Sequence, residues 1–291
     1  MDVGFVCSRV RKDEKLLLEE LRGRGHDVVK IDPRRGSLAL DEPQLEDLAG
    51  AESDADVDDL DVAVNREMSQ SRGLYTTRFL ESYGVPVVNS HSTSEICMDK
   101  VETSLALEEA GVETPETRVA YTEDSAVEAA EELGYPVVVK PVVGSWARLL
   151  GKLNDRDAAE AVFEHKKVLG SYEHSVFYLQ EYVDHGGRDV RAMVADGEVV
   201  AAMERSTDEG WITNAASGAD TTAAELDPST EEAAVSAAEA VGGGVLGVDV
   251  MHREDEPLVH EVNHTLEFKA LTEASDVDVA AEFTDHLEEI A

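Results

Sequence analysis

Residues 245–263 read VLGVDVMHREDEPLVHEVN, and this stretch decides the fold because it combines apolar runs with acids that look buried. Both of its ends are rich in β-branched residues and its centre is polar, which predicts two paired strands. Asp249 lies on the first strand, and Glu261 and Asn263 are two residues apart on the second. Because alternate residues of a strand share a face, we expect these three side chains on one side of the sheet.

Two carboxylates and an amide oxygen on one face favour a Mg²⁺ site. They are hard ligands, of the kind that binds Mg²⁺ together with substrate phosphates. Asp249 lies between Val248 and Val250, and burying its carboxylate is costly unless a cation or a hydrogen-bond donor accompanies it. The alternative is an acidic hairpin that faces solvent. His260 and His264 are too few for a zinc site, so we expect a structural or substrate-orienting role for them.

A second stretch, YPVVVKPVVGSWAR at residues 135–148, places a lysine at the end of an apolar strand. Lys140 can be held rigidly against phosphate oxygens, and Gly144 lets backbone N–H groups approach them. Arg148 can then neutralise charge in a transition state. A solvated lysine followed by an ordinary turn is the alternative. The chain has no Walker A sequence, which excludes a P-loop NTPase.

A third stretch, Gln180–Val183, lies where a strand passes into a loop and can offer backbone groups to an adenine. The sequence GRDVR follows at 187–191. Asp189 and Arg191 can hold ribose or anionic groups there, although a surface ion pair is an equal alternative.

The rest of the chain alternates between strand-like and helix-like segments. In the first 90 residues this pattern predicts a mostly parallel sheet with helices on its faces. A second unit begins near Ser92 with one long helix. The strands that we expect are Val3–Cys7, Val28–Ile31, Asp61–Asn65, Pro86–Asn89, Tyr135–Lys140, Phe177–Tyr182, Arg191–Val194, Val199–Arg205, Val245–Met251 and Leu258–Val262. The helices that we expect are Glu14–Arg22, Ser71–Tyr83, Glu95–Glu109, Asp124–Leu133, Ala158–Leu169 and Thr230–Ala240.

Composition limits the function classes. The 291 residues are 42% hydrophobic, which suits two or three packed subdomains. The net charge of −38 predicts a solvated acidic surface adapted to concentrated salt, as in a halophile; a surface that docks a basic partner is the alternative. No basic stripe for nucleic acid and no membrane-spanning run is present. We expect Cys7 and Cys97 to be buried and unpaired, which predicts a reducing, salt-rich cytoplasm. The N-terminus is expected to form a strand and not a leader peptide.

Taken in order, these stretches resemble the ATP-grasp superfamily, and more closely the ligases of lysine and arginine biosynthesis that act on a LysW-type amino-group carrier protein. Those ligases are related to the enzyme that glutamylates ribosomal protein S6. The acidic composition is similar to that of haloarchaeal members. The matching stretches are SQSRGL at 69–74, KPVVGSWARLL at 140–150, QEYV at 180–183, GRDVR at 187–191, WITN at 211–214, EVNH at 261–264 and EFK at 267–269.

The resemblance implies an α/β (α+β) fold: an ATP-grasp fold with an N-terminal Rossmann-like pre-ATP-grasp domain. We expect that first domain at 1–91, a central ATP-grasp subdomain with the phosphate loop at 92–178, and a C-terminal subdomain with the metal site at 179–291.

The resemblance also assigns roles to residues. Those implied to contact ATP are Lys100, Lys140, the mobile loop Gly144, Ser145, Trp146, Ala147, Arg148, Leu149 and Leu150, the hinge Gln180, Glu181, Tyr182 and Val183, and Asp189 with Arg191. Ala147 stands where the family often has Gly. The implied catalytic residues are Arg148, Arg191 and Arg205, and the implied metal ligands are Asp249, Glu261 and Asn263. The residues implied to bind the amino acid are Arg205, Asn214, Lys269, Ala270 and Leu271.

The implied activity is an ADP-forming ligation with ATP and two Mg²⁺ ions. ATP phosphorylates the side-chain carboxylate of the C-terminal glutamate of a small acidic carrier protein, and an amino acid's α-amino group then attacks the acyl phosphate. The amino acid is glutamate or α-aminoadipate, and the pair Ala270–Leu271 favours glutamate. A homodimer or homotetramer is expected. The alternatives are another acceptor, as in S6-like glutamylation or glutathione-synthetase-like ligation, and a nucleotide-binding regulator without turnover.

Overall fold

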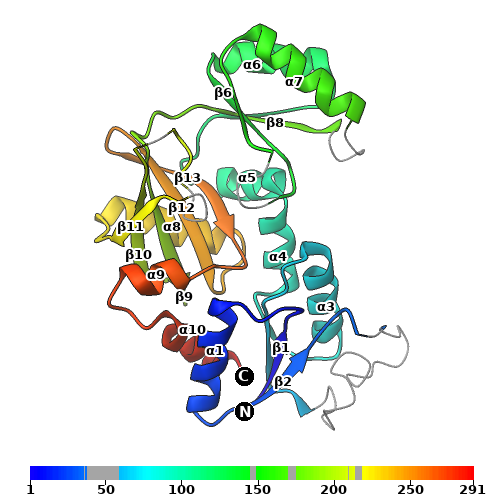
Figure 1. Cartoon of the computed structure of the whole chain (residues 1–291), viewed down its shortest axis with the longest axis vertical. Coiled ribbons are helices and arrows are strands. Elements are labelled where there is room, and N and C mark those ends of the chain that lie inside the picture. The colour runs from blue at the N-terminus through cyan, green and yellow to red at the C-terminus, as the bar shows by residue number, and fades with distance from the viewer. Residues whose placement is uncertain (36, 38–58, 145–148, 170–174, 209, 214–217) are drawn as a thin grey trace.

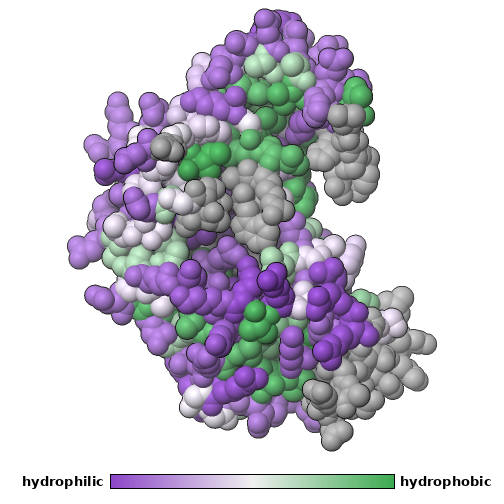
Figure 2. All heavy atoms as spheres, in the orientation of Figure 1, coloured by the Kyte–Doolittle hydropathy of each residue, from purple (hydrophilic) through white to green (hydrophobic). Residues whose placement is uncertain are grey.

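The computed structural model describes residues 1–35, 37, 59–144, 149–169, 175–208, 210–213 and 218–291. These residues form three sheets with helices packed on them (Figure 1). No helix within the described ranges is long and apolar enough to cross a membrane. Hydrophilic side chains dominate the face shown in Figure 2, which agrees with the charge of −38.

The N-terminal unit is a parallel sheet, as the alternating pattern predicts. Its strand order is β2-β1-β3-β4, and every pairing in it is parallel. The strands are β1 (Asp2–Val6), β2 (Asp27–Ile31), β3 (Val62–Asn65) and β4 (Val87–Val88). Its helices are α1 (Lys12–Gly23) and α3 (Gln70–Ser82). Leu17 and Leu21 of α1 pack on Val3 and Phe5 of β1, so the helix covers one face of the sheet.

The prediction of a single helix at Glu95–Glu109 is wrong, because two helices form there: α4 (His91–Met98) and α5 (Lys100–Glu109). Asp99 between them has extended backbone angles, with φ −106° and ψ 118°, and its carboxylate accepts hydrogen bonds from two N–H groups at the start of α5. A residue that caps a new helix cannot continue the old one. The break makes Lys100 the first residue of α5.

The central unit is a small antiparallel sheet in the order β5-β8-β6-β7, covered by two helices. Its elements are β5 (Thr117–Ala120), α6 (Glu123–Leu133), β6 (Val137–Lys140), β7 (Gly151–Leu153), α7 (Arg156–Leu169) and β8 (Phe177–Glu181). The expected domain boundary at 178/179 falls inside β8, which pairs with β5 and β6 as far as Glu181. The central sheet therefore extends three residues beyond that boundary.

The C-terminal unit is a larger antiparallel sheet in the order β11-β10-β9-β12-β13. Its elements are β9 (Arg188–Ala195), β10 (Glu198–Ser206), β11 (Asp220–Ala223), α8 (Pro228–Ala240), β12 (Leu246–Arg253), β13 (Glu256–Asn263), α9 (Lys269–Ala274) and α10 (Val279–Ile290). The paired strands expected within 245–263 are confirmed as the β12–β13 hairpin, in which Asp249 lies opposite Glu261. Helix α8 and Leu107 of α5 pack on one face of this sheet.

The ends of the chain join the first and last units into one core. Phe283 and Leu287 of α10 are buried with Leu17 and Leu21 of α1. Sequence analysis did not predict α10, since its acidic positions were read only as solvated surface.

Asn89, just after β4, also ties these units together. Its Nδ2 donates to the carbonyls of Val245 and His264 at 2.7 and 2.6 Å, and its Oδ1 accepts from the Val245 N–H at 2.7 Å. Gly244 has φ +110°, and a Cβ there would lie 2.2 Å from Asn89 Oδ1, so only glycine fits. Asn89 thereby fixes the start of β12 and the loop after β13 against the N-terminal unit.

Candidate active site

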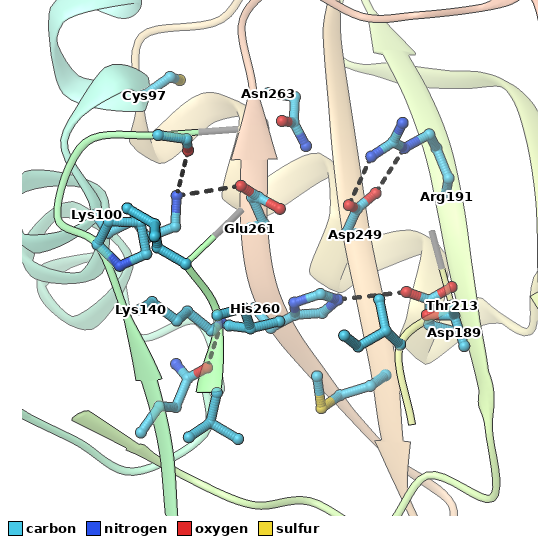
Figure 3. A pocket seen from close by; sticks show the side chains of 18 of the residues that line it. Cys97, Lys100, Lys140, Asp189, Arg191, Thr213, Asp249, His260, Glu261 and Asn263 are labelled. Atoms are coloured by element: carbon cyan, nitrogen blue, oxygen red, sulfur yellow. Dashed lines mark hydrogen bonds and ion pairs between the residues drawn. The ribbon is translucent and has the colours of Figure 1, made fainter. Parts of the chain in front are cut away.

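One cavity of about 460 Å³ is lined by residues from all three units. The C-terminal sheet contributes acids and arginines, the central unit contributes Lys140 and the segment 180–183, and α5 contributes Lys100. Figure 3 shows Lys100 and Glu261 pointing toward each other, with Asp249 and Arg191 beside them. Four stretches distant in sequence therefore converge, as the predicted site requires.

A row of charged side chains crosses neighbouring strands of the C-terminal sheet. Arg191 on β9 is opposite Asp249 on β12, and its Nε and Nη2 donate to the two carboxylate oxygens at 2.7 Å each. Arg205 on β10 is opposite Asp189 on β9; its Nε donates to Asp189 at 2.7 Å, and its Nη2 also lies 3.2 Å from Asp249. Both aspartates are buried, so the arginines supply the cations that their burial requires.

The cations keep these acids ionised despite burial. Burial by itself raises the pKa of the Asp249 carboxyl, but Arg191 and Arg205 outweigh it and hold the pKa well below its usual range. Glu261 behaves in the same way: burial raises its pKa, and Lys100 and Lys140 lower it overall. Both groups are therefore anionic at neutral pH.

The donor set on this face fits Mg²⁺. The described part of the chain contains no group of three His, Cys, Asp or Glu side chains placed to share an ion. An ion here would thus take Asp249 and Glu261, with the Asn263 amide and substrate or water oxygens completing the octahedron. Asn263 lines the same cavity, and its amide oxygen is the atom that would bind an ion, while its buried Nδ2 has no hydrogen-bond partner among the described residues.

Two lysines lie opposite this acidic face. Lys140 ends β6, is only 9% exposed, and donates from Nζ to Gln180 Oε1 at 2.6 Å. Burial lowers the pKa of Lys140 from about 10.5 to about 8. Lys100 donates to the carbonyl of Gly144 at 3.0 Å and lies 3.3 Å from Glu261 Oε1. Two ammonium groups in a partly closed cavity suit phosphate oxygens.

The segment 180–183, expected as the adenine hinge, lines the cavity in full. The Tyr182 ring is held by Lys152, whose Nζ lies 3.4 Å from its centre, and by Trp211 in an edge contact at 6.0 Å. A fixed aromatic ring beside a strand end is a surface on which a planar base can pack.

Some expected contacts are not seen. Leu271 is fully buried in the core, Ala270 packs on that core, and the Lys269 ammonium lies 3.8 Å from Glu273; none of the three lines the cavity. The preference for glutamate drawn from Ala270 and Leu271 therefore has no direct contact to support it. All three residues belong to helix α9, which begins at Lys269.

Other expected residues fall elsewhere. Gly144, Leu149 and Leu150 line the cavity, whereas residues 145–148, which include Arg148, and residue 214, the expected substrate ligand Asn214, lie outside the described residues. Cys97 is unpaired and half-buried: it packs against the core beneath the C-terminal sheet and also lines the cavity, whereas Cys7 is unpaired and buried in the core as expected.

Sequence reasoning missed the contribution of the N-terminal unit. Arg11, Glu67, Met68 and Gln70 line the cavity, as does Glu267 from the loop after β13. The stretches 69–74 and 267–269 were part of the family resemblance, but of their residues only Lys269 was assigned a place in the site.

Comparison with known proteins agrees with this geometry. A family model described as a RimK-like ATP-grasp domain matches residues 97–287, and a LysX preATP-grasp domain matches residues 3–96. The chain is 31% identical over 272 residues to the alpha-aminoadipate–LysW ligase LysX of Saccharolobus solfataricus, covering 93% of this chain and 94% of that one. It is 30% identical over 293 residues to the glutamate–LysW ligase ArgX of Sulfolobus acidocaldarius, covering 99% and 98%.

A solved RimK domain ATP-grasp protein from Sphaerobacter thermophilus superposes with a TM-score of 0.79 at 28% identity, covering 99% of both chains. The expected ATP-grasp fold with an N-terminal pre-ATP-grasp domain is thereby confirmed.

Proposed function

The chain belongs to the RimK-like ATP-grasp family, with a LysX-type pre-ATP-grasp domain in front, and on that premise we propose that it is a carrier-protein ligase. It joins the α-amino group of glutamate or α-aminoadipate to the side-chain carboxylate of the C-terminal glutamate of a small acidic LysW-type carrier. The observation that carries the proposal is the single cavity in which Asp249 and Glu261 lie opposite Lys100 and Lys140. The LysW ligases among its relatives supply the acceptor.

Lys100 and Lys140 hold the phosphates of ATP while the γ-phosphoryl group passes to the carrier carboxylate, giving an acyl phosphate and ADP. The amino acid's amine then attacks the acyl carbon, an amide bond forms, phosphate leaves with the electrons of the broken C–O bond, and the amine loses a proton. Mg²⁺ on Asp249, Glu261 and Asn263 would neutralise phosphate charge. Arg191 and Arg205 keep Asp249 ionised and oriented. The enzyme acts by positioning and charge, without a protein nucleophile.

ATP-grasp ligases use ATP and Mg²⁺. Two ions are part of the proposal; Asp249, Glu261 and Asn263 would hold them, and the ions would supply charge neutralisation at the phosphates. A homodimer or homotetramer is likewise proposed, and light scattering in concentrated salt measures it.

The test is a mass measurement on the carrier after incubation with enzyme, ATP and Mg²⁺ in KCl of about 2–3 M, which screens the surface charge. We expect the carrier to gain one glutamyl or one aminoadipyl residue and one ATP to be hydrolysed per residue added. A mass gain with glutamate alone assigns the enzyme to arginine biosynthesis, and one with α-aminoadipate alone assigns it to lysine biosynthesis. A gain with both is expected of an enzyme shared by the two pathways, since the one methylene that distinguishes the substrates is worth only about 1–3 kcal/mol in a binding pocket. ATP binding without any gain would indicate another acceptor, such as an S6-like peptide tail.

We also propose adaptation to high salt, which the charge of −38 supports. Self-repulsion destabilises a compact acidic chain in dilute salt, whereas at 1 M the Debye length is only about 3 Å. We expect the midpoint of thermal unfolding, followed by circular dichroism, to rise steadily between 0.1 M and 2 M KCl, and ligation to be lost in dilute buffer as the protein unfolds. Folded, fully active protein at 0.1 M would contradict this.

A further inference from the structure

The N-terminal sheet has a topological switch point that opens into the cavity. In the order β2-β1-β3-β4, the chain passes from β1 to β2 on one side of it. It then crosses to β3 on the other side of β1, so the connections that follow β1 and β3 run in opposite directions along the sheet. In open parallel sheets, ligands bind in the crevice outside the carboxyl ends of such strands. The loops that leave these two strands here carry Arg11 and the group Glu67, Met68 and Gln70, all of which line the cavity.

Glu67 joins the two loops of this crevice. Its carboxylate accepts hydrogen bonds from Ser8 N at 2.8 Å, Ser69 N at 2.9 Å and Arg72 Nη2 at 2.9 Å. These bonds come from the loop after β1, the loop after β3, and α3. The walls of the crevice are thus fixed by a buried acid whose hydrogen-bonding capacity is used within the protein.

Arg11 is held firmly at the same place. Its Nε and Nη2 donate to the two oxygens of Glu14 at 3.1 and 2.8 Å, and the Glu14 side chain is fully buried. Its remaining terminal nitrogen, Nη1, contacts Glu267. A guanidinium fixed along one edge by a buried carboxylate presents its other edge without further loss of side-chain freedom.

The loop from Asn263 to Phe268 connects Arg11 with the metal-binding face. Glu267 is four positions after Asn263 in the chain, so their Cα atoms are at most about 14 Å apart. Arg66 anchors the loop through Leu266 O at 2.8 Å, and Asp13 accepts from Phe268 N at 2.7 Å. Arg11, Glu267 and Asn263 line the same cavity, so Arg11 faces the space that the substrate would share with the reaction centre.

The distribution of charge suggests which group Arg11 binds. Among the described cations of the cavity, Lys100 and Lys140 lie opposite the metal-binding acids, and Arg191 and Arg205 are paired with buried aspartates. Arg11 is paired on its cavity side with Glu267, a loop residue whose side chain is 36% exposed and can be displaced by another carboxylate. The Arg11 side chain itself is only 20% exposed, which suits a small ligand better than a protein tail.

We propose that Arg11 binds a carboxylate of the dicarboxylic amino-acid substrate in the switch-point crevice, taking the place of Glu267; the identity of the ligand rests on the proposed ligase function. Arg11 is thus a specificity-determining residue on the N-terminal unit. It selects an acidic amino acid and holds it with the amine toward the acyl phosphate.

The test compares Arg11→Met and Arg11→Lys with the parent protein in about 2 M KCl. Equilibrium dissociation constants are measured by calorimetry for glutamate, α-aminoadipate and the two monoamides, glutamine and isoglutamine. We expect Arg11→Met to weaken binding of the dicarboxylates about 10- to 100-fold, as for the loss of a hydrogen bond between charged groups. The parent protein should bind glutamate more tightly than the monoamide that lacks the carboxylate bound by Arg11, and we expect Arg11→Met to lose that preference. Loss of the preference over glutamine identifies the side-chain carboxylate, and loss of the preference over isoglutamine identifies the α-carboxylate.

Arg11→Lys keeps a positive charge beside Glu14 and guards against a folding defect; we expect it to retain part of the preference. Lys12→Met is the matched control, since Lys12 is exposed on the same helix and pairs with Glu273 outside the cavity. Unchanged dicarboxylate binding in folded Arg11→Met, or a parent protein that binds no dicarboxylic amino acid, overturns the proposal. The ligase function is scored separately, by trapping the carrier acyl phosphate as a hydroxamate with hydroxylamine in place of the amino acid.

Discussion

Replacing Asp249 by Asn, or Glu261 by Gln, is expected to slow ligation at least about 1,000-fold, because charge stabilisation at the transferring phosphoryl group worth several kcal/mol is lost. Each change keeps the size of the side chain and removes one anionic ligand from the face that fits Mg²⁺. Ligation is measured by the carrier mass shift over a range of Mg²⁺ concentrations. We expect the Mg²⁺ concentration for half-maximal rate to rise in both variants.

The two variants should differ in stability, which separates catalysis from folding. Asp249→Asn leaves Arg191 without its buried counter-ion, whereas Arg205 keeps Asp189, so we expect Asp249→Asn to be the less stable variant. Glu261→Gln leaves Lys100 with the Gly144 carbonyl and should unfold near the parent temperature. Glu256→Gln, exposed at the other end of β13, is the matched control and should be active. Near-normal rates in folded Asp249→Asn and Glu261→Gln would refute the metal assignment.

The shared face of Asp249, Glu261 and Asn263 could be predicted because its signal is local in sequence. Strand alternation in 245–263 specifies which side chains share a face, and a carboxylate between valines needs a cation wherever the strand lies. The same holds for Lys140, whose place at the end of an apolar strand is visible in the sequence. These inferences needed no knowledge of which units pack together.

The rest of the site depends on tertiary contacts that leave little local trace. The break at Asp99 looks like continuous helix in sequence, and only a cap and a bridge to Val143 reveal it. Arg11 lies 256 residues from Glu267, its contact in the cavity. The apolar positions of α10 are spaced among acids, and they acquire meaning only when α1 packs on them.

The pair Ala270–Leu271 illustrates the opposite error. A pattern that distinguishes family members was read as a substrate contact, but both residues pack on the core beside α9. Such a pair could act on the cavity through the preceding loop, whose His264 and Glu267 line it. A residue associated with specificity need not touch the substrate.

Replacing Lys140 by Met should abolish useful ATP binding while making the substrate-free protein more stable. Burial lowers the pKa of Lys140 to about 8 from about 10.5, a penalty on the charged form of about 3 kcal/mol at neutral pH. Met fills a similar space without a charge. The change leaves Gln180 Oε1 without its Lys140 donor, at a cost of about 1–2 kcal/mol, so we expect a net gain of about 1–2 kcal/mol at pH 7. ATP affinity should fall at least about 100-fold, since a buried charge–phosphate contact is lost.

The dependence of the free energy of unfolding on pH tests whether the buried charge of Lys140 destabilises the parent protein. Because the folded pKa lies below the unfolded one, the unfolded parent binds more protons between pH 8 and about 10.5, and its free energy of unfolding rises with pH through that window. Lys140→Met lacks this rise, so its advantage should be constant below about pH 7, shrink above pH 8 and be lost near pH 9, with the parent the more stable protein near pH 10. Denaturant unfolding in concentrated KCl at several pH values measures this. Lys167→Met, which removes an exposed lysine paired with Glu123, should change stability by no more than about 0.5 kcal/mol. A Lys140→Met protein less stable than the parent at pH 7 would mean that Lys140 stabilises the fold, and its burial would then not be explained by ATP binding.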